Sequence, residues 1–225
     1  MASQSSNHFE RLRAKTQFIS NRAFHTNQIF RDHPKLSQIC TDYIIFNHCV
    51  ARATIPLMEQ VVKKAKEITD DPVCPPLIEY MQQHIEEEKD HDKWFARDLG
   101  ALGISEQELA NRMPSPNIAA LIGSQYYWVN HHHPVAFMGY ICSTEAYPPT
   151  EESVQELIDK SQLPAAGFDT LMLHAKIDQG HKHEIVDHLN DLPLTPWHED
   201  IIQMSAFQTF RYLALITEDI CRKAS

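Results

Sequence analysis

Glycine is scarce in this chain, with 6 residues among 225. No stretch alternates between apolar and polar residues for long enough to predict a β-strand. Charged residues instead separate apolar positions at helical spacing over long stretches. At 43% hydrophobic residues, the chain can bury one large core. We therefore expect an all-α protein that folds as a single domain over residues 1–225, with a disordered N-terminus over about residues 1–8.

Positive charge is also in short supply, and the formal net charge is −10. Nucleic acids and anionic membranes attract basic surfaces, so neither is expected as a partner. The N-terminus lacks the apolar segment of a signal peptide, and no apolar run approaches the length of a membrane span. We expect a soluble, cytoplasmic protein that acts on small molecules.

The 5 cysteines give no sign of a disulfide framework or a structural zinc site. They are odd in number and scattered, and no Cys-x-x-Cys pair occurs, which favours reduced thiols. Histidine is the exception to this scarcity, because the chain contains 14 of them. The arrangement of these histidines relative to acidic residues therefore needs an explanation.

Helical periodicity, interrupted by proline and glycine, divides the chain into seven or eight helices. Pro56 lies inside the second helix and is expected to kink or split it. A further interruption is expected near residues 131–134. The predicted helices cover about residues 9–29, 36–68, 77–102, 118–147, 150–161 and 197–221, with a short helix after Ser105 and another after Pro164. Together they predict a helical bundle.

His174, Asp178 and His181 follow one another at steps of four and three residues. On a helix these steps place the three side chains on one face. Leu171 and Ile185 extend that face on either side, so we expect it to point inward. A buried polar group without a partner costs roughly 1 to 3 kcal/mol. A metal ion is one partner that two imidazoles and a carboxylate can share.

A second predicted helix shows the same alternation of apolar and polar groups along one face. His84, Glu87, Glu88 and His91 share this face. Glu88 and His91 have the Glu-x-x-His spacing with which bundle helices hold a carboxylate-bridged iron pair. Glu87 has a simpler interpretation as well, because the acidic run 86–90 is typical of a solvated helix face.

Glu145 follows an apolar run and lies on the same side of its helix as Met138, Ile141 and Cys142. Burial would favour the neutral form of an isolated acid, whereas a divalent metal would hold it ionised. Carboxylates and imidazoles without a thiolate pair suit iron or manganese better than structural zinc. The predicted ligands of two metal ions are Glu88, His91, Glu145, His174, Asp178 and His181, with Glu87 and His84 as secondary candidates.

These motifs occur in a specific order: Glu87-Glu88-x-x-His91-x-x-Trp94, then Glu145, then His174-x3-Asp178-x2-His181. The order resembles the haem-oxygenase-like diiron oxidases and oxygenases, an iron-containing redox enzyme family, over about residues 32–194. The resemblance implies a haem-oxygenase-like bundle and a dinuclear iron cofactor, with manganese as an alternative. It also implies dioxygen-dependent oxidation of a small amine, amino acid or carboxylic acid. Several relatives have a glutamate at the position of His84, so the carboxylate here is Glu88 or Glu87.

Two other functions are compatible with the same sequence. One is a metal-free enzyme on the same scaffold, similar to thiaminase II or the pyrroloquinoline-quinone synthase, with Cys142 or Glu145 as nucleophile or acid. The other is a non-catalytic interaction protein whose buried polar residues form a structural network. Cys142 and Tyr140 are further candidates for lining a substrate pocket. A homodimer is a common state of such domains and stays an open alternative to a monomer.

Overall fold

The regular secondary structure of the described residues is entirely helical. The computed structural model covers residues 7–224, without the side chains of residues 177–181, and within this part no strand occurs. The all-α prediction is confirmed. The α-helices are α1 His8–Arg31, α2 Leu36–Lys66, α3 Cys74–Glu87, α4 His91–Ala101, α5 Glu106–Asn111, α6 Pro116–His131, α7 Phe137–Glu145, α8 Glu151–Ser161, α9 Asp169–Asp191 and α10 Pro196–Arg222, and the 3-10 helices are η1 Pro134–Ala136 and η2 Ala165–Phe168.

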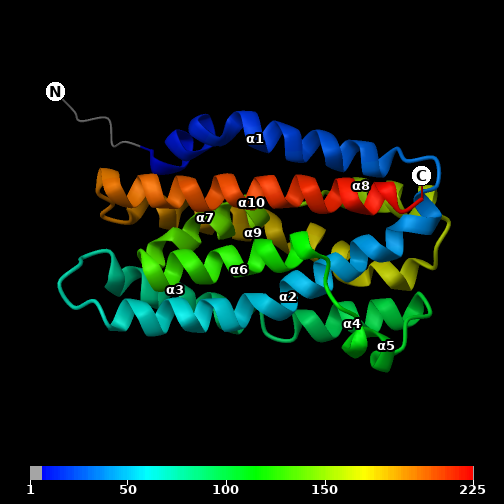
Figure 1. Cartoon of the computed structure of the whole chain (residues 1–225), viewed down its shortest axis with the longest axis horizontal. Helices are drawn as coiled ribbons and strands as arrows, with labels where there is room; N and C mark the ends of the chain where they lie inside the picture. The colour runs from blue at the N-terminus through cyan, green and yellow to red at the C-terminus, as the bar shows by residue number, and fades with distance from the viewer. Residues whose placement is uncertain (1–6, 225) are drawn as a thin grey trace.

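Two long helices, α1 and α10, lie side by side along the length of the molecule (Figure 1). Helix α10 also packs against α6 and α7, while α2 packs against α3, α4 and α6. Helix α7 is consequently enclosed, and all its residues from Phe137 to Ser143 are buried. Glu145, the last residue of α7, follows this buried segment and is itself only partly buried.

The predicted helix over residues 77–102 is divided in two, which corrects one premise of the sequence analysis. Helix α3 ends at Glu87 and α4 begins at His91, and between them Asp90 has a left-handed backbone with φ of 68°. A non-glycine residue in this conformation interrupts an α-helix. Glu88 and His91 therefore meet across a turn and not on one continuous helical face.

The second expected interruption is present, because α6 ends at His131 and Pro134 begins η1. With these two breaks the described residues contain ten α-helical segments, more than the seven or eight predicted. Helix α2 continues through Pro56 and is not split. Figure 1 shows α2 changing direction along its length, as a proline inside a helix predicts.

Polar side chains at the N-termini of several helices fix where these helices begin. The Asn7 side chain accepts the Glu10 N–H and caps α1, inside the segment 1–8 that we expected to be disordered. Residues 1–6 lie outside the described residues. Capping boxes open α5, α8 and α10 at Ser105, Thr150 and Thr195. In each box the side chain of the N-cap residue and that of the residue three positions later accept each other's backbone N–H.

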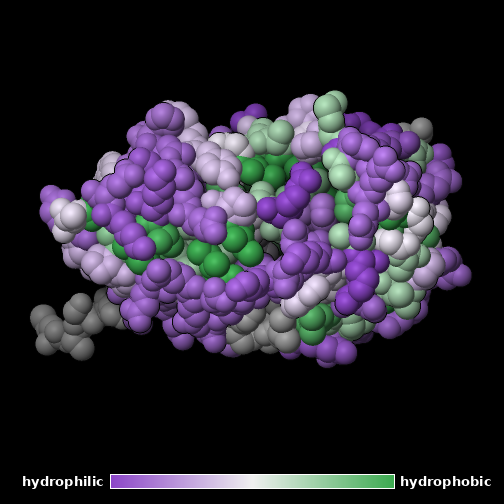
Figure 2. Space-filling model, turned by 90° about the horizontal axis from the view of Figure 1, so that it is seen from below, coloured by the Kyte–Doolittle hydropathy of each residue, from purple (hydrophilic) through white to green (hydrophobic). Residues whose placement is uncertain are grey.

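Hydrophilic side chains cover most of the face shown in Figure 2, and hydrophobic side chains gather in the hollows between them. Among the described residues, no helix combines the length and apolar character needed to cross a membrane.

Candidate metal centre

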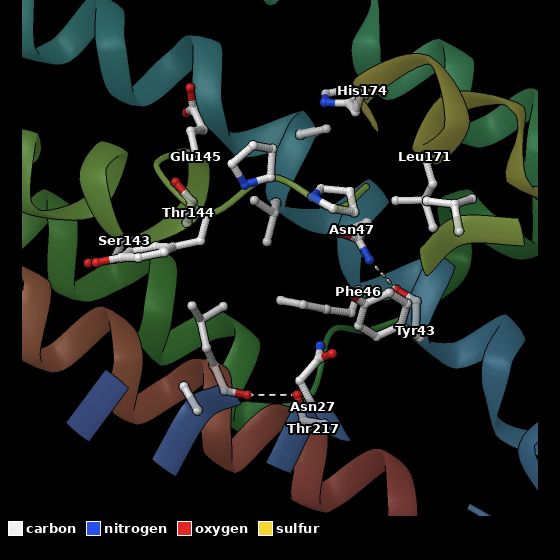
Figure 3. A pocket seen from close by; sticks show the side chains of 18 of the residues that line it. Asn27, Tyr43, Phe46, Asn47, Ser143, Thr144, Glu145, Leu171, His174 and Thr217 are labelled. Carbon is white, nitrogen blue, oxygen red and sulfur yellow. Dashed lines mark hydrogen bonds between the residues drawn. The ribbon is translucent and has the colours of Figure 1, made fainter. Parts of the chain in front are cut away.

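Acidic and imidazole side chains from helices α4, α7 and α9 and from the turn after α3 converge on one end of a cavity of about 540 Å³. Glu88 lies in the turn after α3, His91 begins α4, Glu145 ends α7, and His174 lies on α9. All four line the cavity. Figure 3 shows Glu145 and His174 on the same side of it, on different ribbons.

His84, on α3, lies at the centre of this convergence and is 2% exposed. Its Nε2 is 3.0 Å from Oε2 of Glu145, and its Nδ1 is 3.2 Å from Oε2 of Glu87. Burial alone would lower the pKa of His84, but Glu145, Glu88 and Glu87 together raise it to about 10. In the metal-free protein His84 is therefore an imidazolium, with each nitrogen within 3.2 Å of a carboxylate oxygen.

Glu88 is held by the neighbouring imidazoles. His91 Nδ1 donates to Oε2 of Glu88 at 2.8 Å, and the rings of His91 and His174 meet edge to face with centroids 4.8 Å apart. Burial would raise the pKa of Glu88, but the hydrogen bond from His91 and the charges of His91, His84 and His174 lower it below its usual value. Glu88 is consequently ionised at neutral pH, although its side chain is only 12% exposed.

The donor set and its charge fit a metal ion. His84, Glu88 and Glu145 each offer one ligand atom, and these atoms lie within 4.8 Å of one another. Glu87, Glu88 and Glu145 place three carboxylates around the His84 ring, and a divalent cation bound among them would hold them ionised. Glu87 faces Nδ1 of His84, the position from which a carboxylate orients a metal-binding imidazole. Nitrogen and oxygen donors without a thiolate suit iron or manganese.

The structure brings together Glu88, His91, Glu145 and His174, four of the six predicted ligands. It also places His84, a secondary candidate, 3.0 Å from Glu145. The i, i+4 spacing of His84 to Glu88 was the signal in the sequence for His84. Glu87 contacts Nδ1 of His84, the ring nitrogen that does not face Glu145, and its side chain is 28% exposed. The side chains of Asp178 and His181 lie outside the described residues, so their role as ligands stays a prediction.

Tyr140 and Cys142, the candidate pocket residues on α7, have different surroundings. Tyr140 lines the cavity, whereas Cys142 is absent from its described lining. Burial raises the pKa of the Cys142 thiol strongly, and the charge of Glu145 raises it further. The thiol is therefore protonated at neutral pH, which argues against Cys142 as the nucleophile of a metal-free enzyme.

A second cluster, Asp71, His133 and His198, joins the α2–α3 loop to η1 and α10. Nε2 of His198 is 3.1 Å and Nε2 of His133 is 3.5 Å from Oδ2 of Asp71. The Nδ1 atoms accept backbone N–H groups, from Val135 to His133 and from Thr195 to His198. Because Nδ1 accepts in both rings, each carries a proton on Nε2, the nitrogen nearer to Asp71. Metal ligation through Nε2 requires the opposite tautomer, so this cluster is better explained as a hydrogen-bond network.

Replacing Asp71 by Ala is expected to destabilise the protein without changing its metal content. The substitution removes the acceptor of His198, the negative charge beside His133, and the Oδ1 acceptor of the Val73 N–H at 2.9 Å. We expect the free energy of unfolding to fall by about 2 to 4 kcal/mol, as for buried donors left without acceptors. Urea unfolding measures this loss, and the neighbouring exposed Asp70→Ala is the matched control. A drop in bound iron with unchanged stability would contradict the structural role of the cluster.

Several solved structures resemble this fold. A TenA homologue from Pseudomonas syringae pv. tomato matches with a TM-score of 0.71 at 15% identity, over 95% of this chain and 92% of that one. A domain of unknown function with a haem oxygenase-like fold from Shewanella denitrificans matches with a TM-score of 0.69 at 18% identity, over 93% and 92%. A TenA homologue from P. horikoshii gives 0.63 at 13% identity, over 96% and 98%. At these identities the likeness establishes a haem-oxygenase-like fold.

No curated protein gives a significant sequence match to this chain. The sequence profile of the iron-containing redox enzymes, in contrast, matches residues 76–210. This region spans more than half of the chain and contains His84, Glu88, His91, Glu145 and His174. From α3 to α10 the match therefore follows the helices that build the carboxylate and imidazole cluster, and the chain belongs to the iron-containing redox enzyme family.

Proposed function

We propose that this protein is a nonhaem diiron oxidoreductase that uses dioxygen to oxidise a small organic molecule. The observation that supports this most directly is the position of the cluster. The ligand atoms of His84, Glu88 and Glu145 lie within 4.8 Å of one another, and Glu88 and Glu145 line a cavity that is large enough for a small molecule. A solvated acidic helix face would have neither the burial nor the adjoining cavity.

Each residue of the cluster has a definable task. Glu88 and Glu145 supply the anionic oxygens for divalent cations, and His84, His91 and His174 supply imidazole nitrogens. Asp178 and His181 are predicted to supply a further oxygen and a further nitrogen. Glu87 accepts the Nδ1 proton of His84 and thereby directs Nε2 at Glu145. When bound, iron supplies the activation of dioxygen, a chemistry that side chains lack.

The remaining tasks of the protein are proton handling and exclusion of water. His84 has a raised pKa of about 10 in the metal-free protein, so a cation that binds at Nε2 must displace a proton. Phe46, Phe95 and Leu171 line the same cavity as the ligands. Apolar walls beside the ligands keep bulk water away from the substrate and hold it next to the reacting centre.

Anaerobic titration of ferrous iron into the chelator-treated protein tests the proposal. We expect up to two iron ions per chain to bind with release of protons, and dioxygen to be consumed when air is admitted. The chain contains 14 histidines, so the exposed His131→Ala variant serves as the control for adventitious binding and should behave as the wild type. Turnover that survives chelation would support a metal-free enzyme instead. Binding of no iron, with no turnover, would support a structural network.

A further inference from the structure

We propose that Arg31 binds an anionic group of the substrate at the end of the cavity remote from the metal ligands. This inference rests on the proposed function, and it narrows the substrate class to small organic acids that are oxidised at the end opposite the acid group.

Arg31 and the metal ligands line one continuous cavity from different sides. Figure 3 shows Glu145 and His174 on one side and Asn27 on the opposite side, where α1 passes. Arg31 follows Asn27 by four residues on α1, and residues at this spacing share a helix face. A molecule that fills the cavity would therefore meet carboxylates and imidazoles at one end and a guanidinium at the other.

Arg31 is only partly compensated by the described residues around it. Its side chain is 19% exposed, and Nη2 donates to the carbonyl oxygen of Ser153. Among the described residues, Arg31 forms an ion pair with Glu156, in which Nη2 lies 4.0 Å from Oε2. Glu156 is 54% exposed and lies closer to Lys160, at 2.8 Å. Since a guanidinium has five N–H donors, Arg31 retains the capacity to bind a carboxylate through two parallel hydrogen bonds.

The groups next to Arg31 are suited to an anionic ligand as well. Arg31 is the only Lys or Arg among the described residues that line the cavity. Asn27 and Asn47 line the cavity as well, and Asn47 Nδ2 donates to the backbone carbonyl oxygen of Tyr43 at 2.8 Å. These side chains offer neutral donors beside the guanidinium, which a carboxylate can use without meeting a competing acid.

Apolar and aromatic side chains make up much of the remaining lining, among them those of Phe24, Phe46, Phe95, Tyr140, Phe210 and Leu213. Such a lining favours a hydrocarbon or aromatic body over a strongly polar one. The ligand that fits is an acid with an apolar middle, held with its carboxylate at Arg31 and its other end at Glu88 and Glu145.

Binding of phenylalkanoic acids with one to four methylene groups, each compared with its neutral amide, tests this assignment. The titrations use the metal-free protein, so that a carboxylate cannot bind through iron. We expect at least one acid of the series to bind about 10-fold or more tightly than its amide. Arg31→Met should abolish this preference, and Arg31→Lys should restore part of it. Arg22→Met is the matched control, because Arg22 lies on α1 outside the cavity and pairs with Glu218.

The outcomes separate this inference from the proposed function. A lack of acid preference throughout the series, or its survival in Arg31→Met, overturns the role of Arg31 even if iron binds as proposed. An acid preference that depends on Arg31 supports the anion site even if iron binding fails. The iron stoichiometry of Arg31→Met should equal that of the wild type, and a cooperative thermal transition establishes that the variant is folded even though its hydrogen bond to Ser153 is lost. The conservative Lys variant distinguishes lost charge from lost folding.

Discussion

The Glu145→Gln variant is expected to bind ferrous iron at least about 100-fold more weakly than the wild type and to lose dioxygen consumption. Replacing even the supporting partners of a metal ligand typically costs 10- to 100-fold in affinity, and Glu145 is proposed as a direct ligand. The side chain of Gln keeps the size of Glu but removes the charge that faces Nε2 of His84 at 3.0 Å. Iron content after desalting, together with oxygen-electrode measurements, determines both quantities.

Glu86→Gln provides the control for this experiment. Glu86 is close in sequence to His84, but its side chain is 70% exposed and pairs with Lys89. The control should bind iron as the wild type does. Circular dichroism establishes that both variants are folded before metal is added. Full iron occupancy in a folded Glu145→Gln protein would show that Glu145 is no ligand and would remove the main support for the proposed function.

The helices were predictable from the sequence because their signals are local. Apolar periodicity and the interruptions by proline and glycine located most of the helical segments to within a few residues. The structure adds the caps at Ser105, Thr150 and Thr195. The break between α3 and α4 was missed, because Asp90 adopts a left-handed conformation inside an acidic run that is itself compatible with a helix. Helices α3 and α4 each pack against α2, and these contacts are not visible in the local sequence.

The candidate site was predictable in composition but not in geometry. Placing acids and histidines inside apolar stripes identified Glu88, His91, Glu145 and His174, which the structure brings to one cavity. The sequence could not show that His84 lies at the centre of the site, because its contact with Glu145 joins α3 to α7, which are far apart in sequence. Arg31 was missed for the same reason, because its role depends on the cavity between helices and no local pattern marks it.

Gly139→Ala is expected to be strongly destabilising, because α7 and α10 are in backbone contact at this position. A Cβ atom at residue 139 would lie 2.1 Å from the carbonyl oxygen of Ile202 and 2.7 Å from the backbone nitrogen of Ala206. Backbone atoms cannot rotate away, so one of the helices must shift. We expect a loss of about 3 kcal/mol, at the upper end of the usual cost of overpacking. For a chain of this size that loss lowers the unfolding midpoint by about 6 to 12 °C.

Gly123→Ala is the matched control, since residue 123 lies inside α6 and has no atom within 4 Å of a built Cβ. Alanine has the higher helix propensity, so this variant should gain roughly 0.5 to 1 kcal/mol. Both variants are compared by thermal and urea unfolding of the metal-free protein, because bound iron would add its own stabilisation. Glu145 ends the helix that begins just before Gly139, so a shift of α7 should also weaken iron binding in Gly139→Ala. Equal stability of the two alanine variants would show that α7 and α10 are less closely packed than described, and it would remove the packing that fixes Glu145 opposite His84.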